Sequence, residues 1–149
     1  MSPLEFQKEL LFGLENPHKV KSAIDAFQEG AASPEMRKSA LAYAGMGYFN
    51  ALEHLMIRVL KFHQITIPTG STSHQMILTA FQNQTSDLEI HASVVDAIKR
   101  LLGFRHVANK IHGFLINPHK STEIVAVIQE NHGLFVEMLN KIVRRILPG

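Results

Sequence analysis

The sequence predicts an all-α protein, an antiparallel up-and-down helical bundle. Apolar residues recur at intervals of three and four through most of the 149 residues, which is the spacing of amphipathic helices. Proline directly follows a serine or asparagine where several of these segments begin. Only residues 65–67 alternate as a strand would, and three residues are too few. Since a chain of this length buries a full core without disulfides and has no cysteine, we expect one domain, residues 1–149.

Residues 1–31 are predicted to form an N-terminal extension, an added pair of helices. Ser2 and Glu5 have the spacing of a capping box, with Pro3 in the first turn. Asn16-Pro17 is expected to end the first helix and start the second, because proline lacks the backbone donor that a helix interior needs.

Residues 34–147 are predicted to form the core bundle. Its longest helix is expected over 34–63, and Gly45 and Gly47 within it indicate a kink or a close helix crossing. Three further helices are expected over residues 72–81, 86–117 and 122–147. The pairs Thr72/Gln75 and Ser86/Glu89 have capping-box spacing and would open the first two of these helices.

Charge and hydropathy exclude some classes of protein. The formal net charge of +2 is too small to argue for nucleic-acid binding by itself. No stretch approaches the ~20 apolar residues of a membrane span, and Glu5, Lys8 and Glu9 interrupt the pattern of a signal peptide. The sequence therefore predicts a cytoplasmic protein without a membrane partner.

Arginines precede histidines by a short spacer at three places in the sequence. The pairs are Arg58/His63, Arg100/His106 and Arg105/His112. At about 100° per residue, only the last pair, seven residues apart, shares one helix face, with a separation of roughly 10 Å along the axis. Asn109 lies between its two members on the same face. An arginine, an amide and a histidine in this order suit phosphate binding and proton transfer, although a solvated helix face has the same pattern.

The segment 103–114, Gly-Phe-Arg-His-Val-Ala-Asn-Lys-Ile-His-Gly-Phe, resembles the motif of HEPN-domain proteins, specifically their HepT-like branch. That motif has an arginine, an adjacent Asn, Asp or His, four to six further residues and a histidine, and Arg105, His106 and His112 match these positions. The segment 48–53 is similar to the second core helix of the family. The resemblance covers roughly residues 34–147 and implies a HEPN-type bundle.

The resemblance implies a metal-independent endoribonuclease without cofactors, active as a homodimer whose motif helices face each other across a cleft. His112 would transfer protons and Arg105 would bind the phosphate of RNA. His106 or Asn109 would orient the histidine or bind RNA, and Glu53 is a candidate acidic partner from the long helix. The expected product ends in a 2′,3′-cyclic phosphate.

The resemblance also implies a toxin–antitoxin module with a cognate minimal nucleotidyltransferase as antitoxin. In the family, that partner transfers AMP to a tyrosine two residues after the motif histidine. Here the position is Phe114, which has no hydroxyl group to modify. Neutralisation by complex formation stays open, as does a non-catalytic role as helical adaptor or substrate-binding subunit for a nucleotidyltransferase.

Other classes fit the sequence less well. Glu15 and His18 have the Glu-x-x-His spacing of di-iron bundles, but Pro17 interrupts it, and no metal site is expected. Gly70-Ser71 followed by Asp87 and Glu89 is similar to a nucleotidyltransferase site, but no sheet is predicted to present the acids. The cluster Lys141, Arg144 and Arg145 is read as favourable charge at a helix C-terminus rather than as an RNA contact.

Overall fold

The computed structural model describes the backbone of residues 2–29, 34–110 and 118–147, and within these ranges all side chains except those of 27–29, 34–39, 106–110 and 118–119. The described residues form five helices and no strand, which confirms the all-α prediction. The helices are α1 (Pro3–Glu29), α2 (Pro34–Phe62), α3 (Ser73–Gln84), α4 (Ala92–Lys110) and α5 (Pro118–Ile146).

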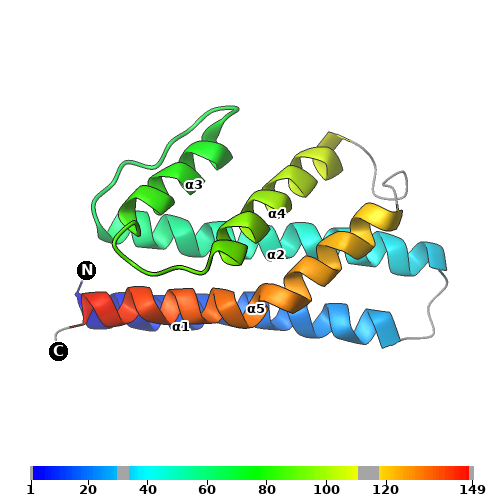
Figure 1. Ribbon diagram of the computed structural model, residues 1–149, viewed down its shortest axis with the longest axis horizontal. Helices are drawn as coiled ribbons and strands as arrows, with labels where there is room; N and C mark the ends of the chain where they lie inside the picture. The colour runs from blue at the N-terminus through cyan, green and yellow to red at the C-terminus, as the bar shows by residue number, and fades with distance from the viewer. Residues whose placement is uncertain (1, 30–33, 111–117, 148–149) are drawn as a thin grey trace.

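Helix α2 is the central element of the bundle, because it contacts each of the other four helices. Helices α1 and α5 pack on one side of α2 and also against each other, whereas α3 and α4 lie on its other side (Figure 1). The N-terminal half of α5 also packs against α4. This arrangement places α2, α3 and α4 around one shared surface.

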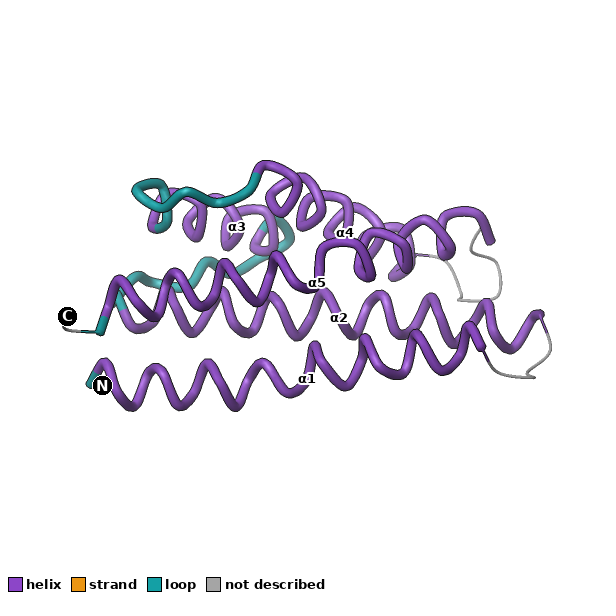
Figure 2. The backbone as a smooth tube through the Cα atoms, turned by 60° about the horizontal axis from the view of Figure 1, so that its bottom comes forward, coloured by secondary structure: helices purple, strands orange, loops and turns teal. Residues whose placement is uncertain are grey.

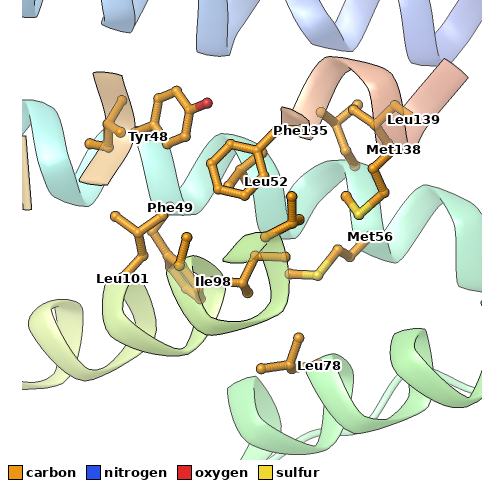
Figure 3. Packing of buried hydrophobic residues seen from close by; sticks show 14 of the residues in the cluster. Tyr48, Phe49, Leu52, Met56, Leu78, Ile98, Leu101, Phe135, Met138 and Leu139 are labelled. Carbon is orange, nitrogen blue, oxygen red and sulfur yellow. The ribbon is translucent and has the colours of Figure 1, made fainter. Parts of the chain in front are cut away.

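One hydrophobic core contains side chains from all five helices. Its largest fully buried members include Tyr48 and Phe49 of α2, Phe81 of α3, Leu101 of α4 and Phe135 of α5. In Figure 3, Phe49 and Leu101 lie beside each other where α4 packs against α2. The periodic apolar positions of the sequence therefore bury their side chains between the helices.

Helix α1 is continuous, so the prediction of two N-terminal helices was wrong (Figure 2). Pro17 lies inside it and is buried. An interior proline costs a helix about 3 kcal/mol, but Leu10 and Leu14 before it and Ile24 after it are buried in the core. Packing on both sides of the proline offsets the lost hydrogen bond.

The capping boxes of the sequence form at only one of three places. The Ser2 backbone N–H donates to Glu5 Oε2 at 3.1 Å, and the Glu5 N–H donates to Ser2 Oγ at 3.2 Å, as predicted. Helix α3 does follow Thr72, but the Thr72 side chain makes no capping bond. The helix predicted from Ser86 was placed too early, because α4 begins only at Ala92.

Side chains near the end of α5 bind residues 84–91, which run from the end of α3 to the start of α4. Arg145 Nη1 donates to the carbonyl oxygen of Gln84 at 3.1 Å and forms an ion pair with Asp87. Lys141 Nζ donates to the carbonyl oxygen of Glu89 at 2.6 Å. The carbonyl oxygens of Gln84 and Glu89 thus receive hydrogen bonds from side chains instead of from a continuing helix. Two members of the C-terminal basic cluster, Lys141 and Arg145, therefore have a structural role.

Gly45 marks a close helix crossing, one of the two predictions made for it. A Cβ atom at this position would lie 3.0 Å from Ile124 Cγ2 and 3.2 Å from Phe104 Cε1. The crossing therefore brings α2 close to both α4 and α5. Gly47 has no such neighbours, since no atom beyond its own stretch of helix lies within 4 Å of its ideal Cβ position.

A chain of three polar side chains connects α2, α5 and α1. The Tyr48 hydroxyl lies 2.7 Å from His132 Nδ1, and His132 Nε2 lies 2.8 Å from His18 Nδ1. Burial raises the pKa of Tyr48, so its hydroxyl stays protonated and donates a hydrogen bond to His132 Nδ1. Burial also lowers the pKa of His132, with a smaller contribution from His18. The first shift keeps Tyr48 a neutral phenol and the second favours a neutral His132 imidazole, as this chain of hydrogen bonds requires.

Candidate functional site

Side chains of three helices converge where α4 crosses α2 near the start of α3. Arg105 of α4 donates from Nε to Asn50 Oδ1 of α2 at 3.0 Å. Its Nη1 lies 2.9 Å from His74 Nε2 of α3. His74 Nδ1 in turn lies 2.5 Å from Glu53 Oε2 of α2. We call Asn50, Glu53, His74 and Arg105 the α2–α3–α4 cluster.

The donors in this cluster determine the tautomer of His74. A guanidinium only donates, so Nε2 of the imidazole must present its lone pair to Arg105. The ring proton is then on Nδ1, from which it is donated to the Glu53 carboxylate. In this arrangement His74 is a neutral imidazole between a cation and an anion. The hydrogen bonds thus order the groups as carboxylate, imidazole and guanidinium.

The ring of Phe49 contacts two members of the cluster, His74 and Arg105. Its ring meets the His74 ring edge to face, with centroids 6.3 Å apart and an interplanar angle of 69°. Arg105 Cζ lies 5.9 Å from the centroid of the same ring, within the range of a cation–π contact. Because Phe49 is buried in the core, its contacts help to position the His74 ring and the Arg105 guanidinium.

A groove of about 670 Å³ runs between α3 and α4 and ends at the cluster. Its walls are polar on the α3 side and basic on the α4 side, where Lys99 and Arg105 line it. The remaining lining residues are Ser71, Thr72, His74, Gln75, Leu78, Thr79, Gln82, Leu102 and Gly103. None of these lining residues carries a carboxylate, so the groove suits an anionic ligand with hydrogen-bonding groups.

The structure places two of the predicted site residues in this cluster, Arg105 and Glu53. Glu53 does not touch the arginine directly but reaches it through His74. His106 and Asn109 belong to the backbone of α4, and their side chains lie outside the described part of the chain. His112 and Phe114 lie outside the described residues altogether, so the predicted pairing of Arg105 with His112 stays a prediction.

Arg105 differs from the two other arginines of the spacing pattern. Arg58 forms an ion pair with Glu9 at 3.1 Å, and Arg100 lies within 4 Å of carboxylate oxygens of two acids. Arg105 instead has described hydrogen bonds to a neutral amide and a neutral imidazole. A guanidinium held by neutral groups binds a phosphate more readily than one already paired with a carboxylate.

Sequence reasoning missed His74 and Asn50 as site residues. Asn50 lies in the segment 48–53 that resembles the family, three residues before Glu53 and therefore on the same helix face. That spacing was available in the sequence. His74 is separated from Glu53 by 21 positions and from Arg105 by 31, and no local spacing relates it to either residue.

Two other features are absent from the described part of the chain. It contains no group of three or more His, Cys, Asp or Glu side chains placed to hold a metal ion. Among the helices described, none is long and apolar enough to cross a membrane.

The fold and the site define an all-α bundle with an arginine, an imidazole and a carboxylate beside a basic groove. The model of a protein family described as "HepT-like protein" matches residues 40–146, more than two thirds of the chain. The chain therefore belongs to the HepT-like family, as its motif predicted. The matched segment begins within α2, and α1 precedes it. Neither the curated proteins nor the solved structures contain a significant match.

Proposed function

We propose that this chain is a metal-independent endoribonuclease, the toxin of a module whose antitoxin is a minimal nucleotidyltransferase. The observation that carries the proposal is the position of Arg105, a guanidinium held by neutral partners on the wall of a basic groove. Membership of the HepT-like family supports the same class of activity.

The chemistry of RNA cleavage matches these residues. RNA carries its own nucleophile, the ribose 2′-hydroxyl, so no metal-bound water is needed to start the reaction. Arg105 would bind the phosphate and stabilise the charge that develops on its oxygens. His112, seven residues further along the chain, would transfer a proton. Attack by the 2′-oxygen leaves one product with a 2′,3′-cyclic phosphate and the other with a 5′-hydroxyl.

The proposal includes a homodimer in which two motif helices face one cleft. His106 or Asn109 would contact RNA or orient the histidine. The nucleotidyltransferase would neutralise the toxin by forming a complex with it, because Phe114 has no hydroxyl that could receive AMP.

The test is cleavage of a labelled RNA in EDTA by the purified chain, with analysis of the product ends and of the mass in solution. We expect His112→Ala to lose about 10²–10⁴-fold in rate and Arg105→Ala about 10²–10³-fold. Arg100→Ala is the matched control, because Arg100 is an exposed arginine of the same helix that pairs with acids.

Full activity of His112→Ala would end the assignment of that histidine. A wild-type chain that cleaves no RNA would end the nuclease proposal and leave the adaptor of a nucleotidyltransferase as the function that remains. Binding of the chain to a purified minimal nucleotidyltransferase tests the partner separately from catalysis.

A further inference from the structure

We propose that His74 is a second catalytic histidine of this site, the base that takes the proton from the 2′-hydroxyl of RNA, and that Glu53 positions it. The inference rests on the proposed function and extends it by assigning separate tasks to two imidazoles. It comes from the α2–α3–α4 cluster and the groove beside it, because His74 and Glu53 lie outside the arginine–histidine motif.

The ring of His74 already has the protonation state of a general base. Its Nε2 carries the lone pair, and its Nδ1–H is donated to Glu53 at 2.5 Å. A carboxylate in this position holds the tautomer and stabilises the imidazolium that forms when Nε2 accepts a proton. The Glu53 side chain is only 12% exposed, so its attraction for the imidazolium is weakly screened.

The position of the ring is fixed as well as its proton. Phe49 contacts the His74 ring edge to face, and the hydrogen bond from Nδ1 to Glu53 limits rotation of the ring. His74 also lines the groove between α3 and α4, with 32% of its side chain exposed. A ligand in the groove can therefore reach the imidazole without a rearrangement of the helices.

In the structure Arg105 occupies the lone pair that the base would use. Its described hydrogen-bond acceptors, Asn50 and His74, are neutral, whereas a phosphate is negatively charged and accepts two parallel hydrogen bonds from a guanidinium. We infer that the scissile phosphate draws Arg105 from His74 and frees Nε2. The 2′-hydroxyl belongs to the ribose that carries this phosphate on its 3′-oxygen, so a phosphate bound by Arg105 would bring it close to the freed nitrogen.

The proposed step balances without a metal or an oxidant. The proton of the 2′-hydroxyl passes to His74 Nε2 while the 2′-oxygen forms a bond to phosphorus. The bond from phosphorus to the 5′-oxygen breaks, and the leaving oxygen takes a proton from the general acid, the role that the proposed function assigns to His112. Arg105 stays on the phosphate oxygens. Water restores both histidines to their starting states after the products leave.

A pair of RNA substrates separates base from acid. One has the normal 5′-oxygen at the cleavage site, and the other has sulfur, which departs as a thiolate and needs no proton. We expect His74→Ala to lose about 10²–10⁴-fold in kcat on both substrates. His112→Ala should lose a similar factor on the oxygen substrate and regain most of it on the sulfur substrate.

Two variants separate catalysis from a supporting role of His74. In His74→Gln the amide oxygen can still accept from Arg105 but the side chain cannot carry a proton, so we expect the same loss as in His74→Ala. Glu53→Gln should lose less than either variant, because the imidazole remains. His54→Ala is the matched control, an exposed histidine of α2 that does not line the groove, and it should cleave like the wild type. Circular dichroism confirms the fold of each variant.

Wild-type kcat in His74→Gln or His74→Ala would overturn the inference and leave the nuclease proposal standing. Recovery of His74→Ala on the sulfur substrate would overturn it too, since the residue would then be an acid. Absence of cleavage by the wild-type chain would overturn both proposals together.

Discussion

Valine in place of Gly45 tests the helix crossing that places Arg105 beside α2. The ideal Cβ already lies 3.0 Å from Ile124 Cγ2 and 3.2 Å from Phe104 Cε1, whereas carbon atoms pack best at roughly 3.5–4.0 Å. Valine adds two more methyl groups to this contact. Overpacking of this kind costs about 1–3 kcal/mol.

Gly47→Val supplies the matched control for this substitution. Both variants replace a glycine inside α2, and both gain roughly 0.3 kcal/mol or slightly more in helix propensity. Only Gly45 has neighbours within 4 Å of the added atom. The difference in unfolding free energy between the two variants therefore measures the crossing alone, and we expect about 1–3 kcal/mol.

Urea denaturation followed by far-ultraviolet circular dichroism measures this difference, and an unchanged slope keeps the comparison valid. The melting temperature of Gly45→Val should fall by about 2–4 °C for each kcal/mol at this chain length. Because Phe104 precedes Arg105 in α4, the same substitution should also slow the proposed RNA cleavage more than Gly47→Val does. Equal stability of the two variants would refute the close crossing.

Two further predictions concern stability. Leu101→Ala should cost about 2–5 kcal/mol, because the side chain is fully buried, whereas Leu4→Ala, at an exposed position, should cost little; equal effects in urea denaturation would contradict the described core. Burial lowers the pKa of His132 and of His63, so the unfolded chain binds more protons as the pH falls below their ordinary value of 6.5. The free energy of unfolding should therefore decrease from pH 7.5 to pH 5.5, and by less in His132→Gln; a wild type that gains stability over this range would contradict the shifts.

The helices were predictable because their determinants are local. Apolar spacing located the helical segments, and the Ser2–Glu5 capping box formed as predicted. The break predicted at Pro17 was wrong because the free-energy cost of an interior proline is local, whereas the packing that offsets it comes from α2 and α5. The start of α4 was misplaced because Lys141, far along the chain, binds the backbone at Glu89.

The candidate site was predictable only in part. The motif identified Arg105, and the resemblance of segment 48–53 drew attention to Glu53. His74 connects these two residues, but its relation to them depends on how α3 packs against α2 and α4. No short spacing encodes a contact of that kind.

The sequence by itself determined the helical class, the family and the arginine of the motif, because helix periodicity and a short motif are properties of neighbouring residues. Only the tertiary structure decided which side chains surround that arginine. Its contacts cross 31 positions to His74 and 55 to Asn50. Contacts over such separations form through the packing angles of whole helices, which depend on the complete core rather than on any one segment.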